Sequence, residues 1–84
     1  MEQVPPFSQK ARSLKRGVYQ HYKGNFYEVI EVARHSETLE EMVIYRALYG
    51  EQDVWVRPLS MFLETVLIKN QEVLRFKFIK NQDS

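Results

Sequence analysis

The sequence contains no cysteine, and its 84 residues include only three glycines, three prolines and two histidines. Without cysteine there is no disulfide, no thiolate metal ligand and no cysteine nucleophile. So few glycines form no glycine-rich phosphate loop. No apolar stretch reaches the ~18 residues that a membrane-spanning helix needs, and residues 1–17 lack the apolar block of a secretory signal. We therefore expect a soluble protein without a membrane partner, and the missing cysteine suits the reducing cytoplasm.

What is present is the composition of an ordinary globular domain. Hydrophobic residues make up 44% of the chain and charged residues 27%, so disorder throughout is not expected. The length argues for a single domain. A chain of this size buries only roughly 60% of the surface that its unfolded form exposes, so its core must be thin.

The net charge of +1 conceals an asymmetry. Residues 1–16 hold four cations against one acidic residue, a net charge of +3 that leaves −2 for the rest of the chain. The pattern predicts a flexible basic arm over residues 1–15, a single small β-barrel domain over residues 16–80 and a frayed tail over residues 81–84. Such an arm can touch phosphate, or it can be a solvated terminus.

After Gly17 the pattern is that of short strands. "GVYQHYK" and "FYEVIEVARH" are rich in aromatic and β-branched residues, and the turn residues at 23–25 between them indicate a hairpin. Glu28 and Glu31 lie in opposite phases of a two-residue alternation, so both can face solvent only if the second strand contains a bulge near Val29 and Ile30.

Residues 38–49 admit two interpretations. Residues 38–41 have the form of a helical capping box, and apolar side chains at 39, 42, 43 and 47 lie on one helical face. Against this, "MVIYRALY" holds β-branched and aromatic residues that suit a pleated strand. We favour the strand, and the helix remains the alternative.

The remaining segments complete a mainly β chain. A turn at residues 50–53 precedes the strand "VWVRP", Pro58 can open a helical turn near residues 58–64, and "VLRFKFIK" alternates apolar and cationic residues. Five to six short strands with closely spaced turns predict a small, antiparallel, strongly bent SH3-like barrel.

Several blocks of the sequence match a known pattern. They are "YQHYKG" at residues 19–24, "ARHSET" at 33–38, "VIYR" at 43–46 and "WVRPLSMF" at 55–62. In this order they resemble the domain-of-unknown-function family 1653, a set of small bacterial proteins, over roughly residues 16–78. The resemblance implies no activity, because none is established for the family.

The polar cluster after the second strand is one candidate site. Arg34, His35, Glu37 and Thr38 lie where a strand ends and a turn begins. In the structural interpretation Ser36 and Thr38 bond nearby backbone groups and Glu37 accepts from free amides, so the cluster only holds the turn. Alternatively, His35, Glu37 and Thr38 converge as ligand contacts at the mouth of the barrel.

Trp55 and Arg57 form the second candidate. Two residues apart on a strand, they project from one face, and an arginine beside an aromatic plane can hold a carboxylate, a phosphate or a stacked base. In the structural alternative Trp55 is buried and Arg57 pairs with Glu37 or Glu40.

Other chemistries have weaker support. Five tyrosines among cations suggest a stacking surface for single-stranded nucleic acid, but a domain of charge −2 lacks the usual basic bias. His21 and His35 lack metal-ligand spacing, and no cofactor is indicated. An enzyme would have to use His35 and Glu37 for acid–base chemistry, and we lean against one.

The sequence thus predicts a non-catalytic binding module. Its shallow pocket would lie between the 34–40 turn and the 55–57 strand and hold a small anionic or planar group, such as a nucleotide, single-stranded nucleic acid or a peptide carboxylate. The alternative is a protein-interaction or self-association module that pairs an exposed strand edge with a partner strand.

Overall fold

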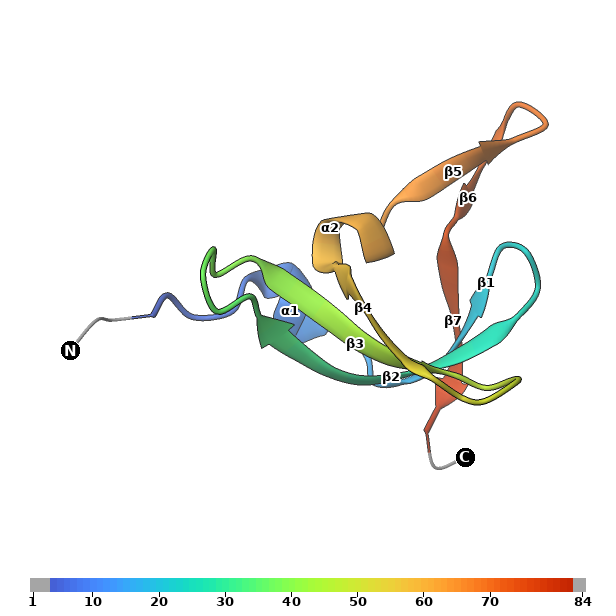
Figure 1. Ribbon diagram of the computed structural model, residues 1–84. Coiled ribbons are helices and arrows are strands. Elements are labelled where there is room, and N and C mark those ends of the chain that lie inside the picture. The colour runs from blue at the N-terminus through green and yellow to red at the C-terminus, as the bar shows by residue number, and fades with distance from the viewer. Residues whose placement is uncertain (1–3, 83–84) are drawn as a thin grey trace.

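The computed structural model describes residues 4–82 as one strongly bent antiparallel sheet with a hairpin projecting from it (Figure 1). The elements in chain order are α1 (Gln9–Ser13), β1 (Gly17–His21), β2 (Phe26–Arg34), β3 (Glu41–Ala47), β4 (Val54–Pro58), α2 (Leu59–Phe62), β5 (Thr65–Ile68), β6 (Gln71–Leu74) and β7 (Phe76–Asn81). The main sheet has the order β4-β3-β2-β1-β7, and within the described residues β5 pairs with β6 alone. Neither helix in the described part of the chain is long and apolar enough to cross a membrane.

The first hairpin and its bulge are confirmed. β1 and β2 pair across the predicted turn, where Gly24 adopts a φ of 113° that an L side chain would strain. The register between β2 and β3 shifts between Val29 and Glu31, which is the bulge required by the two out-of-phase acids. Because of this shift, Val29 and Val32 both face the core although they are three residues apart.

The ambiguous segment is a strand, as favoured from the sequence. β3 buries Val43, Tyr45 and Ala47 at every second position, the period of a pleated strand. The capping box does not start a helix, because Leu39 has a left-handed φ of 66° and the Thr38 hydroxyl accepts a hydrogen bond from the Glu40 backbone. These contacts form a tight turn between β2 and β3.

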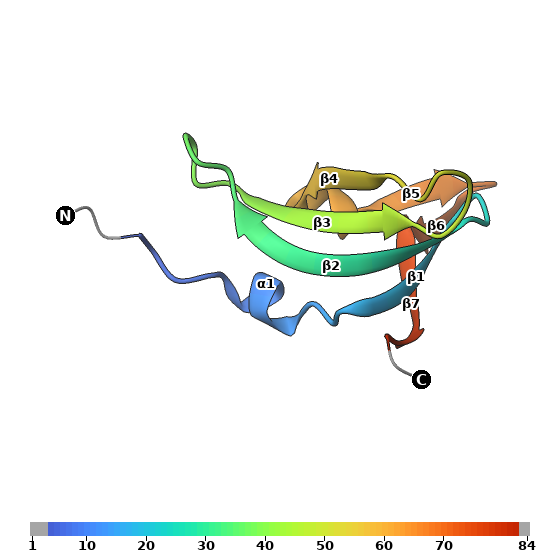
Figure 2. The same ribbon diagram turned by 60° about the horizontal axis from the view of Figure 1, so that its bottom comes forward.

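The sheet curls around its core, but the described strands do not close into a barrel (Figure 2). The mainly β, antiparallel and bent architecture is confirmed, while β4 and β7 remain two separate edges. The core lies on the concave face, where Phe62 of α2 stacks on Phe76 of β7 at 4.2 Å between ring centroids. Residues 4–82 form seven strands, two of them in the separate hairpin, where the sequence predicted five to six.

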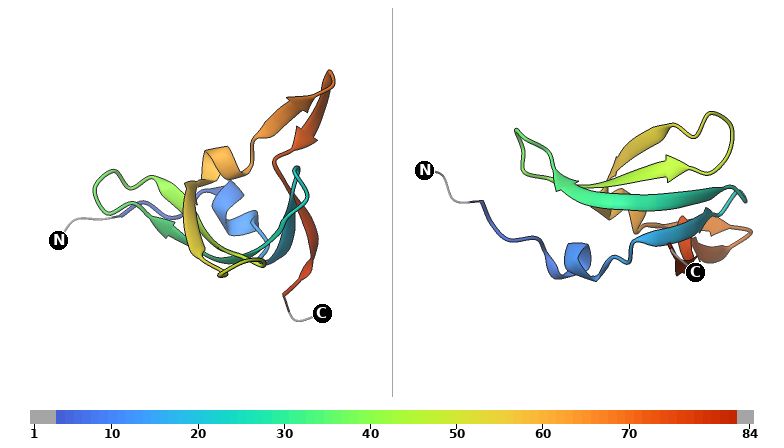
Figure 3. Two further views of the ribbon diagram at one scale, coloured as in Figure 1. Left: turned by 45° about the vertical axis from the view of Figure 1, so that its right-hand side comes forward. Right: turned by 90° about the horizontal axis from the view of Figure 1, so that it is seen from below.

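The N-terminal segment, expected from the sequence as a flexible arm, packs against the sheet over its described residues. Residues 4–14 run back along the sheet, with α1 on its concave side (Figure 3), and Ala11 and Leu14 are buried in the core. Ser8 caps α1 and also donates from its backbone and its hydroxyl to the Glu41 carboxylate. The sequence did not predict this packing, because the two apolar residues that anchor the segment lie among charged ones. Residues 1–3 lie outside the described part.

The C-terminal segment is kinked rather than continuous. The helical turn near residues 58–64 is confirmed as α2, but the stretch "VLRFKFIK" divides at Arg75 into β6 and β7. There the Arg75 backbone donates to Glu64 and accepts from Tyr22. Consequently Phe76 is buried whereas Leu74 is half exposed. Of the tail predicted over 81–84, Asn81 pairs with Gly17 in the sheet, and residues 83 and 84 are not described.

Candidate functional site

The side chains of the 34–40 turn mainly bond to the turn itself. The His35 Nδ1 accepts hydrogen bonds from the backbone N–H groups of Glu37 at 3.1 Å and Thr38 at 3.3 Å. The backbone of His35 donates to Glu40 at 2.8 Å and closes the loop. The sequence assigned such bonds to Ser36, Thr38 and Glu37; of these, the Thr38 hydroxyl accepts from the Glu40 backbone at 3.2 Å, and the His35 ring makes the others. Ligand binding by these residues stays a prediction.

Arg34 is occupied by the N-terminal segment. Its guanidinium lies 3.9 Å from the centre of the Phe7 ring and donates to the carbonyl of Pro5 at 2.9 Å. A cation over an aromatic face is attracted by the ring quadrupole. Arg34 therefore fastens residues 5–7 to the sheet, and the structure does not bring it together with Trp55 and Arg57.

Trp55 and Arg57 lie on one face of β4, as their two-residue spacing predicts, and they line one cavity together with three tyrosines. The cavity has a volume of about 210 Å³ and is lined by Tyr27, Tyr45, Tyr49, Trp55 and Arg57. The strand register assembles it, because Trp55 lies directly opposite Tyr45 on β3, and Tyr27 on β2 lies opposite Ala47, two residues further on. Three strands and the turn after β3 thus contribute to one site.

Hydrogen bonds and ring contacts hold the walls of this cavity. The hydroxyls of Tyr27 and Tyr49 bond each other at 2.6 Å, and the Arg57 Nε donates to the Tyr45 hydroxyl at 3.2 Å. The Tyr27 ring meets both tyrosine partners edge-on, with 5.5 Å between centroids. Burial and the bond to Tyr49 raise the pKa of Tyr27 to about 12, so its phenol stays protonated at neutral pH. The site is preorganised rather than loose.

The cavity also carries a positive charge without an acidic partner. The ion pairs among residues 4–82 join Arg16 to Glu31 and Arg75 to Glu64, and neither involves Arg57. Arg57 lies 5.7 Å from the centre of the Phe76 ring. Trp55 is 53% exposed, so it is not the buried structural tryptophan of the alternative interpretation. An accessible indole beside an uncompensated guanidinium suits a planar, negatively charged group.

His21 is a residue of this region that sequence reasoning considered only as a metal ligand. Its ring lies edge-on to Phe76 at 4.9 Å and to Tyr27 at 6.3 Å. Burial lowers its pKa, and the positive charges of Arg57, Arg75 and Lys23 lower it further. The Nδ1 atom accepts a hydrogen bond from the Lys23 backbone at 3.2 Å, so the neutral ring carries its proton on Nε2. One feature of the sequence could have placed His21 here. It lies two residues after Tyr19 on β1, so both side chains belong to the concave face.

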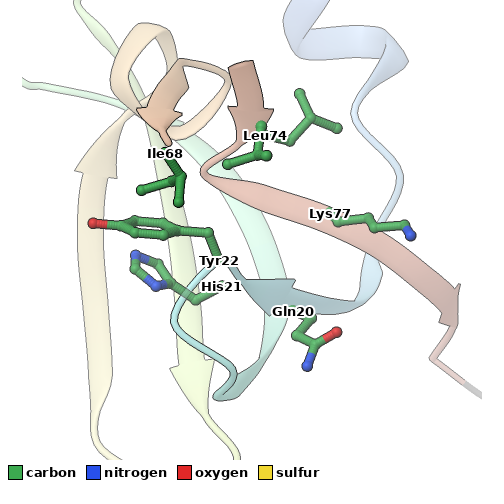
Figure 4. A pocket seen from close by; sticks show the side chains of 7 residues that line it. Gln20, His21, Tyr22, Ile68, Leu74 and Lys77 are labelled. Atoms are coloured by element: carbon green, nitrogen blue, oxygen red, sulfur yellow. The ribbon is translucent and has the colours of Figure 1, made fainter. Parts of the chain in front are cut away.

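A second cavity lies on the other side of His21, between β1 and the projecting hairpin (Figure 4). Its volume is about 360 Å³, and it is lined by Gln20, His21, Tyr22, Ile68, Val73, Leu74 and Lys77. Tyr22 lies against His21 with 4.5 Å between ring centroids. Gln20 and Lys77, paired across β1 and β7, supply the polar end, and aliphatic side chains supply the rest.

The five tyrosines do not form the continuous stacking surface considered for nucleic acid. Tyr19 and Tyr45 are buried in the core, whereas Tyr22 and Tyr49 are exposed and belong to different cavities. The part of the chain that the structure describes also contains no group of three histidine or carboxylate side chains placed to hold a metal ion.

Comparisons with known proteins agree with the fold and the sequence blocks. The crystal structure of a protein of the same family from Bordetella bronchiseptica superposes with a TM-score of 0.78 and is 32% identical; the match covers 88% of this chain and 97% of that one. A search of the curated proteins gives no match. The model of the family described as "Protein of unknown function (DUF1653)" matches residues 17–78, which confirms the resemblance seen in the sequence. The chain therefore belongs to the DUF1653 family.

Proposed function

We propose that the protein is a non-catalytic binding module whose cavity at Trp55 and Arg57 holds a planar group that bears a negative charge. The observation that carries this proposal is the Arg57 guanidinium, which has no acidic partner in residues 4–82 and lies among aromatic walls. A guanidinium retains its charge at any physiological pH and matches a carboxylate or phosphate with two parallel donors. With no cysteine to oxidise, the chain suits the cytoplasm, where we propose that it acts.

The size of the cavity limits what enters it. Its 210 Å³ is smaller than the ~300 Å³ at which sites for whole drug-sized ligands begin. It therefore takes one ring or one acidic group at the end of a larger ligand. Trp55 stacks on the planar part, Arg57 neutralises the charge, and the phenol groups of Tyr27 and Tyr49 orient the bound group.

The test uses the fluorescence of Trp55, the single tryptophan of the chain. The protein is titrated at low salt with benzoate, with adenosine monophosphate and with a short oligouridine, to distinguish a carboxylate, a mononucleotide and single-stranded nucleic acid. We expect at least one probe to change the emission saturably and to bind more weakly as salt is added. If none of the three does so, the proposal is wrong.

Two arginine variants distinguish specific binding in the cavity from nonspecific attraction to positive charge. Arg57→Gln is expected to weaken binding by about tenfold or more, because a charged hydrogen-bond donor is lost. Arg46→Gln is the matched control: it removes the same charge from β3, at a position between the core-facing Tyr45 and Ala47 and hence on the other face. Equal losses in both variants would show nonspecific attraction instead of a site.

A further inference from the structure

We infer that two copies of the chain pair along β4, in an antiparallel register that is centred on Trp55 and sets Asp53 of each copy opposite Arg57 of the other. β4 ends the main sheet, and among the described residues it pairs with β3 alone. Its outer edge therefore offers backbone groups to an incoming strand. Such pairing goes beyond the proposed function, because it assigns a partner to the strand edge in addition to a ligand in the cavity.

Hydrogen bonding to β3 identifies the backbone groups that β4 directs outward. The Ala47 backbone donates to Asp53 at 3.0 Å, which makes these two residues a hydrogen-bonded antiparallel pair. Because such pairs alternate along the ladder, every second residue from Asp53 onward bonds to β3. The residues between them, Val54 and Val56, direct their N–H and C=O groups toward the open edge.

The register centred on Trp55 uses all of these outward groups. It sets Val54 of each copy opposite Val56 of the other in a hydrogen-bonded pair, so both valines donate and accept. Pro58 also directs its backbone outward and has no N–H to donate. In this register Pro58 lies opposite Gln52, whose φ of 58° already belongs to the turn before β4. The missing donor therefore lies outside the paired segment.

The two neighbouring registers leave outward groups unpaired. A pairing centred on Val56 sets Pro58 opposite Val54, whose carbonyl then has no donor. A pairing centred on Val54 sets Val56 opposite Gln52, whose N–H already donates to the Tyr49 carbonyl at 3.0 Å. The backbone therefore favours the register that lies between these two.

The charges of the two copies are complementary in the favoured register. Asp53 directly precedes β4, and its side chain alternates onto the face that carries Trp55 and Arg57. Asp53 and Arg57 of opposite copies form a non-hydrogen-bonded pair, in which side chains approach most closely. Opposite charges at such positions stabilise the pairing. The two-fold symmetry of the dimer forms this ion pair twice.

The apolar side chains are complementary as well. Val54 of one copy lies beside Val56 of the other on one face of the sheet, and the two Trp55 side chains are neighbours across the two-fold axis on the other face. These three side chains are each at least 50% exposed in the single chain. Pairing therefore removes apolar surface from water along the whole segment.

Both members of the proposed ion pair are available in the single chain. The ion pairs among residues 4–82 include neither Asp53 nor Arg57. In the dimer each guanidinium gains a carboxylate, so a small anion in the cavity competes with the second copy for Arg57. The opposite edge of the sheet lacks this complementarity, because β7 carries Lys77 and Lys80, and lysine on an edge strand discourages pairing.

The first test measures sedimentation of the full chain over a range of concentrations, without added ligand. We expect a dimer that dissociates on dilution, with slower amide hydrogen exchange at Val54 and Val56 in concentrated than in dilute samples. A monomer at every concentration would overturn the inference. A dimer in which these two amides gain no protection would overturn it too, because it would use another surface.

Charge reversal tests the register. Asp53→Arg sets arginine opposite arginine twice in the dimer, and we expect it to weaken dimerisation by at least about tenfold. Arg57→Asp sets aspartate opposite aspartate and is expected to do the same. An equimolar mixture of the two variants sets the arginines of one chain opposite the aspartates of the other, and we expect it to dimerise again. A mixture that stays monomeric would overturn the inference.

Glu51→Arg is the matched control. It makes the same change of charge at an exposed turn position, before the segment that the register pairs, and we expect it to leave dimerisation unchanged. Equal losses in Glu51→Arg and Asp53→Arg would show general repulsion and overturn the inference. If Arg57→Asp does not fold, the comparison of these two variants decides in its place, because both positions are exposed and precede β4.

Failure of the pairing is distinguishable from failure of the cavity. The anion titrations are made at a dilution that gives the monomer. If benzoate or the mononucleotide binds there and the chain never dimerises, the strand pairing is overturned and the binding module stands. If the dimer forms through β4 and none of the three probes binds the monomer, the pairing stands and the proposed function is overturned.

Discussion

The Nε atom of Arg57 donates a hydrogen bond to the Tyr45 hydroxyl at 3.2 Å, across the pairing of β3 with β4. Tyr45 is itself 5% exposed and packs edge-on against Phe62 and Phe76. A core residue therefore fixes the direction of the guanidinium at the surface. The bond involves Nε alone, so the terminal nitrogens stay available for a ligand.

The first prediction concerns this bond. Tyr45→Phe keeps the ring in the core but leaves the Nε of Arg57 without its acceptor. We expect a loss of about 1 kcal/mol in the free energy of unfolding, and several-fold weaker binding of the small anion because the guanidinium is no longer held in place. Denaturant unfolding and Trp55 fluorescence measure the two effects. Tyr22→Phe, outside the cavity, is the control, and equal behaviour of the two variants would contradict the prediction.

The second prediction concerns the N-terminal segment. Leu14 is 8% exposed and belongs to the core, so Leu14→Ala removes buried methyl groups and leaves a cavity. We expect it to lower the free energy of unfolding by about 2–4 kcal/mol. Arg12→Ala, on the exposed side of α1, is expected to cost about 0.5 kcal/mol or less. A flexible arm would make both substitutions neutral, and chemical denaturation distinguishes these cases.

Local patterns predicted much of the fold. The hairpin around Gly24, the bulge after Val29 and the strand Glu41–Ala47 all follow from turn residues and two-residue periodicity. The packing of α1 did not follow, since a five-residue helix has little periodicity and is anchored by contacts between Ser8 and Glu41, which are 33 positions apart. The kink at Arg75 likewise depends on bonds to the distant Glu64 and Tyr22.

The candidate site was also predictable in part from local sequence patterns. The alternation of β4 placed Trp55 and Arg57 on one face, and the cavity lies there. Which residues complete it depends on the register of three strands, and the bulge in β2 shifts that register by one residue. Single-sequence reasoning therefore joined Arg57 to the 34–40 turn, whereas the structure surrounds it with Tyr27, Tyr45 and Tyr49.

The third prediction concerns Gly17, at the start of β1. A Cβ atom there would lie 2.5 Å from the Lys80 carbonyl oxygen and 3.1 Å from the Phe78 ring. The ring can shift, but the carbonyl belongs to the backbone of β7, so Gly17→Ala must move the two strands apart. We expect a loss of about 1–3 kcal/mol in the free energy of unfolding. Adding Phe78→Leu relieves only the ring contact, so a double variant with restored stability would contradict this explanation.

The fourth prediction concerns pH and His21. Burial and the charges of Arg57, Arg75 and Lys23 lower the pKa of His21 below its ordinary value of 6.5. As the pH falls below 6.5, the unfolded chain takes up this proton before the folded chain does. The contribution of His21 to stability is therefore complete above pH 6.5 and is lost as the pH falls through its folded pKa. We expect the parent to lose stability over this range and His21→Gln to lose less of it.

Imidazole NMR titration in the His35→Gln variant, which leaves a single histidine, measures the pKa of His21 itself. A midpoint at or above 6.5 would show that neither burial nor Arg57 acts on this ring.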